Sequence, residues 1–268
     1  MRFGVTANPH IASAKEAAER ILHYLEPKHE VVLESDLAQS LGRKGLPLAH
    51  MKADVVLAIG GDGTILRAFQ LSDAQILGIN SGSLGFLAEV YAEEAPSYLD
   101  RVARGDYRVE ERLRLRVSVD GKRMFDCANE AVVHTAHVAK IRHFEIHVDG
   151  IVAQRVRADG IIVATPTGST SYSMSAGGPI VDPRVDAIIV TAITPFKPSM
   201  RPFVFPATSE VRVRLMKPRE CLLVMDGQHE VHLKGTEDLL FSGSERRAKF
   251  IRFRDDFYRR IEEKLARQ

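Results

Sequence analysis

The first part of the chain alternates between short apolar runs and stretches with helical periodicity. Each apolar run is short enough for a strand buried on both faces. Between the first two runs, apolar residues recur at helical spacing until Pro27 ends the pattern, and a second helical stretch begins at about Ile65. Alternating strands and helices predict a parallel sheet covered on both faces. The apolar runs are residues 2–6, 31–33, 55–59 and 76–79, and the first helix face consists of Ala14, Ala17, Ala18, Ile21, Leu22 and Leu25.

From about Arg112 the pattern changes to an alternation of apolar and polar residues, which is the period of a half-buried strand. Two Asp-Gly pairs, Asp120-Gly121 and Asp149-Gly150, are typical of hairpin turns. This part of the chain therefore predicts mainly β structure. The expected strands are residues 113–119, 144–148, 151–152, 161–164, 188–191, 211–215 and 222–225.

These patterns predict an α/β fold in two parts. We expect a Rossmann-like N-terminal domain at residues 1–106, a mainly β C-terminal domain at residues 107–245, and a strand and helix at residues 246–268 that pack on the first domain. The last segment has a charged background with an apolar residue at every fourth position, which predicts an amphipathic helix. Its apolar stripe consists of Phe257, Ile261 and Leu265.

Composition narrows the class of protein. Of the 268 residues 45% are hydrophobic and 27% charged, the ordinary range of globular proteins, and a formal net charge of +2 is too small to predict a nucleic-acid partner. Cys127 and Cys221 belong to no CxxC pair, so we expect packed thiols. The sequence has neither a signal-peptide pattern nor a run of 18 apolar residues, so we expect a cytoplasmic protein with no membrane partner.

A glycine-rich turn, Gly60-Gly61-Asp62-Gly63-Thr64, follows the third apolar run and precedes a helix. In α/β sheets, ligands bind at this position. Glycines let backbone N–H groups approach an anion and the helix N-terminus adds positive potential, so the turn is a candidate phosphate-donor loop. A carboxylate there repels phosphate unless it accepts a proton or holds a metal ion. The alternative is that Asp62 only caps the helix.

A second segment, residues 159–180, is rich in hydroxyls and glycines around one aromatic residue, Tyr172. Short hydroxyl side chains and backbone groups suit a ligand with ribose hydroxyls, an amide and a flat base. By composition alone, the alternative is a solvated loop of Ser, Thr and Gly.

Both segments resemble motifs of a known family. GGDGT at residues 60–64 resembles a signature shared by NAD kinases, lipid kinases and phosphofructokinases. DGIIVATPTGSTSYSMSAGGPI at residues 159–180 resembles the NAD kinase signature, with Ser171 in place of the usual alanine and Met174 in place of leucine. Two shorter pieces, Asn129-Glu130 and Asp226-Gly227-Gln228, resemble further motifs of that family in the same order.

The resemblance implies phosphoryl transfer from ATP, or a related donor such as polyphosphate, to the 2′-hydroxyl of the adenosine ribose of NAD, which gives NADP. Mg²⁺ or Mn²⁺ would accompany the donor phosphates, with no metal site built by the protein itself. A homodimer or homotetramer is also implied. Two alternatives stay open, namely a kinase for a lipid or small alcohol and a non-catalytic module that senses NAD(P).

The resemblance also implies roles for individual residues. Asp62 is the candidate catalytic residue, with Gly63 beside it. Asp159 is expected to bind the nicotinamide amide, and in an oligomer this nicotinamide can belong to a ligand held mainly by another subunit. Arg67, Lys140 and Arg157 are candidate cations for the phosphates, each with a solvated surface charge as the alternative. The other residues expected to bind NAD are Asn129, Glu130, Thr167, Thr170, Ser171, Tyr172, Ser173, Met174, Ser175 and Gln228.

Two further clusters have ordinary explanations. His143, Glu145 and His147 would share one strand face, but nothing around them favours an open metal site, so we expect solvated side chains. We also expect a solvated face for the basic residues Arg246, Arg247, Lys249 and Arg252.

Overall fold

The computed structural model describes the chain apart from residues 83–84, 138–139, 198–200 and 266–268. Internal contacts divide the chain into two compact units. The first contains Met1–Glu111 and Ala248–Gln268, and the second contains Arg112–Arg247. The last segment of the chain therefore belongs to the first unit.

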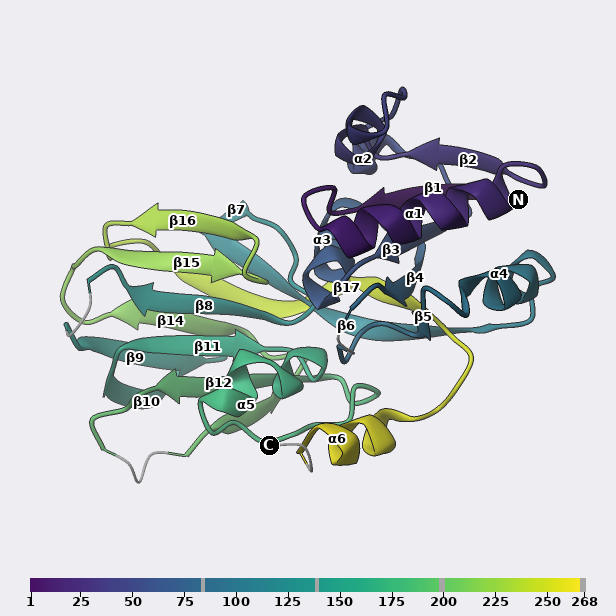
Figure 1. Ribbon diagram of the computed structural model, residues 1–268. Helices are drawn as coiled ribbons and strands as arrows, with labels where there is room; N and C mark the ends of the chain where they lie inside the picture. Colours follow the sequence, from purple (N-terminus) through teal and green to yellow (C-terminus); the bar gives the residue numbers. More distant parts are fainter. Residues whose placement is uncertain (83–84, 138–139, 198–200, 266–268) are drawn as a thin grey trace. The chain divides into compact units, whose positions relative to one another are not determined.

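The first unit is built on a parallel sheet (Figure 1). Its elements are β1 (Arg2–Ala7), α1 (Ala12–Leu25), β2 (Glu30–Leu33), α2 (Ser35–Ser40), η1 (Leu48–His50), β3 (Val55–Ile59), α3 (Asp62–Leu71), β4 (Gln75–Asn80), β5 (Val90–Tyr91), α4 (Ala95–Ala103) and α6 (Phe257–Leu265). The strands β2, β1, β3 and β4 are neighbours in that order, and all three pairs are parallel. The prediction of a parallel sheet is confirmed.

Helices cover both faces of this sheet. Strand β3 is apolar at every position, so both of its faces must be buried. Val55, Leu57 and Ile59 pack in one core with the apolar face of α1. Helix α3 packs against β3 and β4 on its own side, so tightly that a Cβ on Gly78 would lie 2.5 Å from Ile65. The packing of β3 and α3 thus fixes the two ends of the connection between them, and this connection is the glycine-rich turn.

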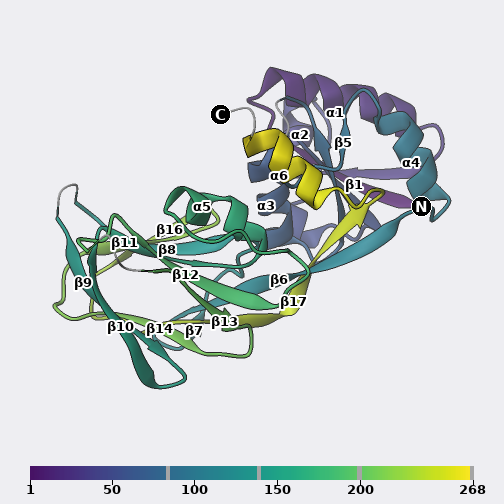
Figure 2. The ribbon, with the colours of Figure 1, turned by 90° about the horizontal axis from the view of Figure 1, so that it is seen from below.

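The second unit consists of two β layers that share an apolar core (Figure 2). One layer has the order β13 (Phe203–Pro206), β12 (Ala187–Ile193), β11 (Gly160–Ala164), β8 (Glu130–Thr135), β15 (Cys221–Met225) and β16 (His229–Leu233). The other contains β10 (Ile151–Ala158), β9 (Arg142–Val148), β14 (Val211–Leu215), β17 (Leu239–Arg252), β6 (Arg108–Val119) and β7 (Lys122–Arg123). Val133 and Ile161 of the first layer pack in the same core as Phe144 and Phe241 of the second. Two short helices, η2 (Thr167–Thr170) and α5 (Tyr172–Ser175), follow β11.

The predicted fold class is confirmed, including the mainly β part and the terminal helix. Both Asp-Gly turns are present, with Asp120 and Asp149 at φ of 49° and 50°. Helix α3 begins at Asp62, earlier than the expected start at about Ile65. In α6 the buried residue is Arg260, not a member of the predicted apolar stripe.

Two predictions from composition can also be compared with the structure. Cys127 and Cys221 are both buried and free, as expected for packed thiols. Within the described residues, no helix combines the length and apolar character that a membrane crossing requires.

Candidate active site

The glycine-rich turn joins β3 to α3 in a conformation that only glycine adopts easily. Gly60 has a φ of +151°, and a Cβ there would lie 2.6 Å from Oγ1 of Thr64. Gly61 precedes the first helical residue, and its carbonyl accepts the N–H of Thr64 at 3.0 Å. Gly61 and Gly63 are exposed. Backbone of this kind at a helix N-terminus is suited to approach by phosphate.

The carboxylate of Asp62 is bound by backbone from another segment, not by its own helix. Its Oδ2 accepts the N–H of Phe86 at 2.8 Å, and its Oδ1 accepts the N–H of Leu87 at 3.1 Å. A Cβ on Gly85 would lie 1.9 Å from Oδ1, so glycine is required for this approach. Asp62 occupies the first turn of α3, where no side-chain cap is formed. Helix capping therefore does not explain its position.

Arg67, the candidate cation on α3, is paired within the first unit. Its Nη2 donates to the buried carboxylate of Glu34, which also accepts the hydroxyl of Thr6, and lies 3.8 Å from Asp36. The hydrogen bond to Glu34 raises the pKa of Arg67, with desolvation opposing it. Arg67 is thus anchored to α2 and the end of β2.

In the second unit, Asn129 and Glu130 lie at the start of β8 and are held by Asp226. Its Oδ1 accepts the N–H groups of Asn129 and Glu130 at 2.8 and 3.1 Å, and its Oδ2 accepts the N–H of Ala128 at 2.8 Å. Asp226 lies in the turn between β15 and β16 at a φ of 51°. Three donors on one carboxylate fix the backbone of residues 128–130.

Two side-chain oxygens at this point have no hydrogen-bond partner among the described residues, although both are buried. They are Oδ1 of Asn129 and Oε2 of Glu130. Desolvation, with a further contribution from the charge of Asp226, raises the pKa of Glu130 to about 8, and a hydrogen bond from Ser171 opposes this. Buried polar atoms are nearly always satisfied, so these two are candidate ligand contacts.

The hydroxyl-rich segment is an ordered turn, not a solvated loop. Gly168 packs so closely on Asn129 that a Cβ would lie 2.3 Å from the Asn129 carbonyl oxygen. Ser171 Oγ donates to Glu130 Oε1 at 3.4 Å, and Ser173 Oγ is 3.1 Å from Thr191 Oγ1. Thr167, Thr170 and Ser173 are buried, Ser171 and Met174 are half-buried, and Tyr172 and Ser175 are exposed.

Asp159 and Gln228 lie in two other connections of the second unit. Asp159, between β10 and β11, accepts the hydroxyl of Thr194 at 2.7 Å, and Thr194 has a φ of 43°. Gln228 is exposed in the turn after Asp226, with its N–H on the carbonyl of Met225 at 2.9 Å. Gln228 thus follows, by two residues, the carboxylate that holds the backbone of residues 128–130.

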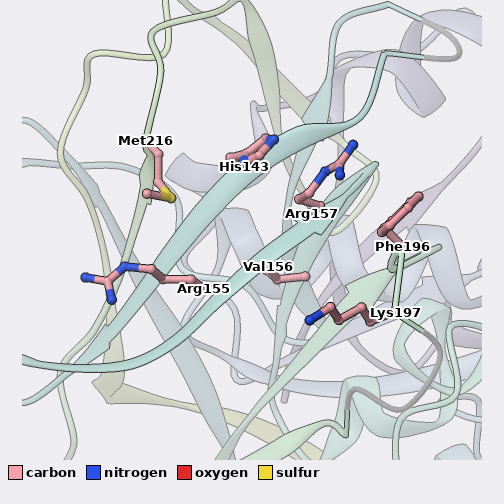
Figure 3. Close-up of a pocket in the computed structure, with 7 residues that line it drawn as sticks. All are labelled: His143, Arg155, Val156, Arg157, Phe196, Lys197 and Met216. Atoms are coloured by element: carbon pink, nitrogen blue, oxygen red, sulfur yellow. The ribbon is translucent and has the colours of Figure 1, made fainter.

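The two candidate cations of the second unit line different pockets. Arg157 lies 4.3 Å from the centroid of the Phe196 ring, in a pocket of about 250 Å³ (Figure 3). Lys140 is exposed and lines another pocket with Arg142, beyond the Thr135 end of β8. Because Glu130 is at the opposite end of β8, Lys140 is not brought together with the Asn129–Glu130 pair.

The two clusters expected to be solvated are so only in part, because His143 is exposed whereas Glu145 and His147 are half-buried. His147 Nε2 and Arg155 Nε lie 2.7 and 2.6 Å from the carboxylate of Glu145, so this carboxylate serves an ion pair on the sheet surface. In the basic cluster, the prediction is wrong for Arg252, whose side chain is only 4% exposed because it is paired with the buried Glu89. The sequence pattern gave no sign of Glu89 beneath it.

Comparisons with known proteins agree with one another. Residues 3–107 match the family model described as the ATP-NAD kinase N-terminal domain, and residues 128–253 match the ATP-NAD kinase C-terminal domain. The chain is 45% identical to an NAD kinase of Methanothermobacter thermautotrophicus over 99% of this chain and 96% of that protein. It is 40% identical to an NAD kinase of Thermoplasma acidophilum over 93% and 92% of the two chains.

Solved structures give the same answer. A yeast NADH kinase complexed with NADH has a TM-score of 0.90 at 26% identity, with 99% of this chain and 87% of that chain covered. An NAD kinase from Archaeoglobus fulgidus in complex with ATP has a TM-score of 0.77 at 30% identity, with 99% of each chain covered. With both family models matched in order along the chain, the protein belongs to the NAD kinase family.

Proposed function

We propose that this protein transfers the terminal phosphoryl group of ATP to the 2′-hydroxyl of the adenosine ribose of NAD, with Asp62 as the proton acceptor. The observation that carries the role of Asp62 is its attachment to the N–H groups of Phe86 and Leu87 at 2.8 and 3.1 Å. One donor on each oxygen leaves further lone pairs to accept a hydroxyl proton. The half-buried carboxylate is thereby oriented without being closed off.

In the proposed step, the 2′-hydroxyl proton passes to Asp62 while the oxygen attacks the γ-phosphorus. The bond between this phosphorus and the bridging oxygen breaks, so ADP leaves with the bond electrons and NADP is formed. The glycine-rich turn supports the donor phosphates through its backbone N–H groups. Positioning and electrostatic stabilisation supply most of the catalysis in such transfers.

We assign the divalent metal ion, Mg²⁺ or Mn²⁺, to the donor rather than to the protein. Within the described residues, no group of three His, Cys, Asp or Glu side chains is arranged to hold a metal ion. ATP phosphates supply oxygen ligands themselves, and Mg²⁺ is commonly bound with few protein ligands. The metal neutralises phosphate charge when bound, while Asp62 acts on the acceptor hydroxyl.

The acceptor is assigned to the dinucleotide class because of Asn129 and Glu130. Their buried oxygens without partners suit the donors of a ribose or an amide, and Ser171 and Tyr172 lie in the adjacent segment. Asp159 is assigned to the nicotinamide amide, and the exposed Arg157 is kept as a candidate cation for the phosphates. Arg67 is paired with Glu34, so a phosphate group that binds Arg67 has to compete with this carboxylate.

The test is an assay of purified protein with ATP, Mg²⁺ and NAD, followed by detection of NADP. Separate reactions replace NAD with NADH, adenosine or a diacylglycerol, and ATP with polyphosphate. We expect NADP formation and much slower turnover of adenosine, because adenosine lacks half of the dinucleotide contacts. Phosphorylation of the lipid, or tight NAD binding without turnover, would replace this proposal with one of the two alternatives.

The role of Asp62 is tested separately by Asp62→Asn, which keeps the shape but cannot accept the proton. We expect kcat to fall by about 10²–10⁴-fold, the usual contribution of a positioned proton acceptor. Asp100→Asn is the matched control, because this carboxylate lies on another helix, α4, with Lys28 at 4.0 Å, and we expect its kcat to stay near that of the parent protein. Near-normal kcat in folded Asp62→Asn protein would remove Asp62 from catalysis and leave the turn as a binding element.

We also propose a homodimer or homotetramer, since closed symmetric assemblies are the common state of soluble enzymes. In such an assembly Asp159 contacts the nicotinamide of a ligand held mainly by another subunit. Light scattering at assay concentration measures the state directly. A fully active monomer would contradict the proposal.

A further inference from the structure

Helix α6 and the end of β17 surround a buried carboxylate, Glu89, whose side chain is 1% exposed. Its Oε2 accepts from Arg252 Nη1 at 3.0 Å and from Arg260 Nη2 at 3.2 Å. Its Oε1 accepts the N–H groups of Phe253 and Arg254 at 2.7 and 3.1 Å. These four donors all come from the segment after residue 247, which they tie to the short stretch between β4 and β5.

The same two arginines hold the backbone next to Glu89. Arg252 Nη1 donates to the carbonyl of Leu87 at 2.9 Å, and Arg260 Nη1 donates to the carbonyl of Ala88 and, at 3.5 Å, to that of Phe86. These carbonyls belong to residues 86–88. The N–H groups of Phe86 and Leu87 face Asp62 instead. One short stretch of backbone thus bonds to the arginines through its carbonyls and to Asp62 through its N–H groups.

We propose that Arg260, together with Arg252 and Glu89, is a positioning residue for Asp62. By fixing the carbonyls of residues 86–88, α6 fixes the direction of the two N–H groups that orient the carboxylate. Lys264, one turn further along α6, adds a contact with its Nζ 3.9 Å from the centroid of the Phe86 ring. The proposal rests on the proposed role of Asp62 as proton acceptor.

A purely structural role for the network is the competing explanation. Burying a carboxylate and two guanidinium groups costs desolvation energy that their attraction only roughly repays, so such a network is weak evidence for stability by itself. The position of the network distinguishes a positioning role from a purely structural one. The arginines donate to the carbonyls of the same residues whose N–H groups bind Asp62.

The first experiment compares Arg260→Met with Arg259→Met in the full-length protein. Arg260 is 8% exposed, whereas Arg259 on the same helix is 57% exposed and pairs with Asp256 and Glu263. Methionine keeps much of the apolar length, and Arg252 remains to neutralise Glu89. For Arg260→Met we expect kcat to fall by about 10²-fold, the effect of a misplacement of about 1 Å, with the KM for NAD and ATP little changed. Arg259→Met is expected to resemble the parent protein.

The second experiment combines Arg260→Met with Asp62→Asn. If Arg260 acts through Asp62, the double variant loses no more kcat than Asp62→Asn alone, because a group that acts through another is non-additive with it. Losses that multiply would show that Arg260 acts elsewhere and overturn the proposal. An active Asp62→Asn protein is a different outcome, because it shows that Asp62 is not the proton acceptor and so removes the premise on which the role of Arg260 rests.

Hydrogen exchange gives a readout that does not depend on activity. The amides of Phe86 and Leu87 should exchange faster in Arg260→Met, while amides of β1 and β3 keep their protection. Arg260→Lys, which keeps the charge but not the planar fork, should be intermediate in both exchange and kcat, and it replaces Arg260→Met if that variant does not fold. Unchanged kcat, or unchanged exchange at Phe86 and Leu87 in a folded variant, overturns the proposal.

Discussion

The carboxylate of Asp226 holds the backbone of Asn129, whose N–H it accepts at 2.8 Å. Asp226 also accepts the N–H groups of Ala128 and Glu130, at 2.8 and 3.1 Å. A residue in a hairpin turn therefore sets the start of β8. The two oxygens without partners, Asn129 Oδ1 and Glu130 Oε2, are presented by this backbone.

Asp226→Asn is expected to destabilise the second unit and to weaken NAD binding. Asparagine tolerates the φ of 51° at this position, but its NH₂ group cannot accept the N–H that one carboxylate oxygen now accepts. A buried donor left without an acceptor costs about 1–3 kcal/mol. The measurements are urea denaturation and the KM for NAD.

Asp149→Asn is the matched control for this change. Asp149 has a similar φ of 50° in an Asp-Gly turn, but its Oδ1 accepts the N–H of Glu210 at 2.8 Å at an exposed site. An asparagine oxygen can replace that acceptor. Equal destabilisation by the two variants would show that the Asp226 carboxylate is not a special support.

Glu130→Gln should change the pH dependence of stability. Burial raises the pKa of Glu130 from 4.5 to about 8. Between these values the unfolded chain releases the proton while the folded protein keeps it, so this group lowers the stability of the parent protein as pH rises through the window. Glutamine has no such proton. The unfolding free energy of Glu130→Gln relative to the parent should therefore increase from about pH 4.5 to about pH 8 and then level off. Denaturation at several pH values measures this difference, and a difference that is constant with pH would refute the raised pKa of Glu130.

NAD binding should release a proton from Glu130 near pH 7. With a pKa of about 8 the carboxyl is mostly protonated there. If Oε2 accepts a hydrogen bond from NAD, the ligand favours the carboxylate and lowers this pKa. Calorimetric titrations in two buffers with different ionisation enthalpies measure the released proton. Glu130→Gln should abolish the buffer dependence, and its persistence in that variant would assign the proton to another group.

Sequence periodicity predicted the framework of the fold better than its polar contacts. The runs at residues 55–59 and 76–79 lie in β3 and β4 because continuous apolar sequence specifies strands buried on both faces. The hairpin turns at Asp120 and Asp149 follow from the local preference of Asp-Gly for positive φ. Helix α4 was not predicted, although Ala95, Leu99 and Val102 are buried at helical spacing, because charged residues dilute this short pattern.

The candidate site was predictable by motif but not by geometry. The glycine turn indicated Asp62, yet no local pattern shows that Phe86 and Leu87 donate to it, since that contact depends on the packing of α3 against β4. Likewise, α6 has an apolar stripe, but the residue that it buries is Arg260 because Glu89 lies there. Contacts between distant segments decide these features, and periodicity carries no information about them.

Asp62→Asn should lower the pKa of Lys264. Burial already lowers the pKa of this ammonium group, and the negative charge of Asp62 opposes that effect. Removing the charge leaves desolvation less opposed, so the ammonium form becomes less favourable. NMR titration of the Lys264 side chain measures the shift, and Asp36→Asn is the control. A pKa that stays the same in Asp62→Asn would mean that the two groups do not interact in solution.

Gly85→Ala should impair catalysis because the new methyl group occupies the place of the Asp62 carboxylate. An alanine Cβ would lie 1.9 Å from Oδ1 and 2.3 Å from Cγ of Asp62, far inside contact distance. The carboxylate can turn away more easily than the backbone can move, so the hydrogen bonds from Phe86 and Leu87 should be lost while the fold persists. We expect kcat to fall by about 10²-fold or more, since the proton acceptor is then misplaced.

Gly82→Ala separates this effect from a general intolerance of alanine in the same connection. A Cβ on Gly82 would meet nothing within 4 Å, and Gly82 is exposed. We therefore expect parental kcat, KM and thermal stability for Gly82→Ala. For Gly85→Ala, amide exchange at Phe86 and Leu87 should rise along with the loss of kcat. Parental kcat in folded Gly85→Ala would show that the observed orientation of Asp62 is not the one that catalysis uses.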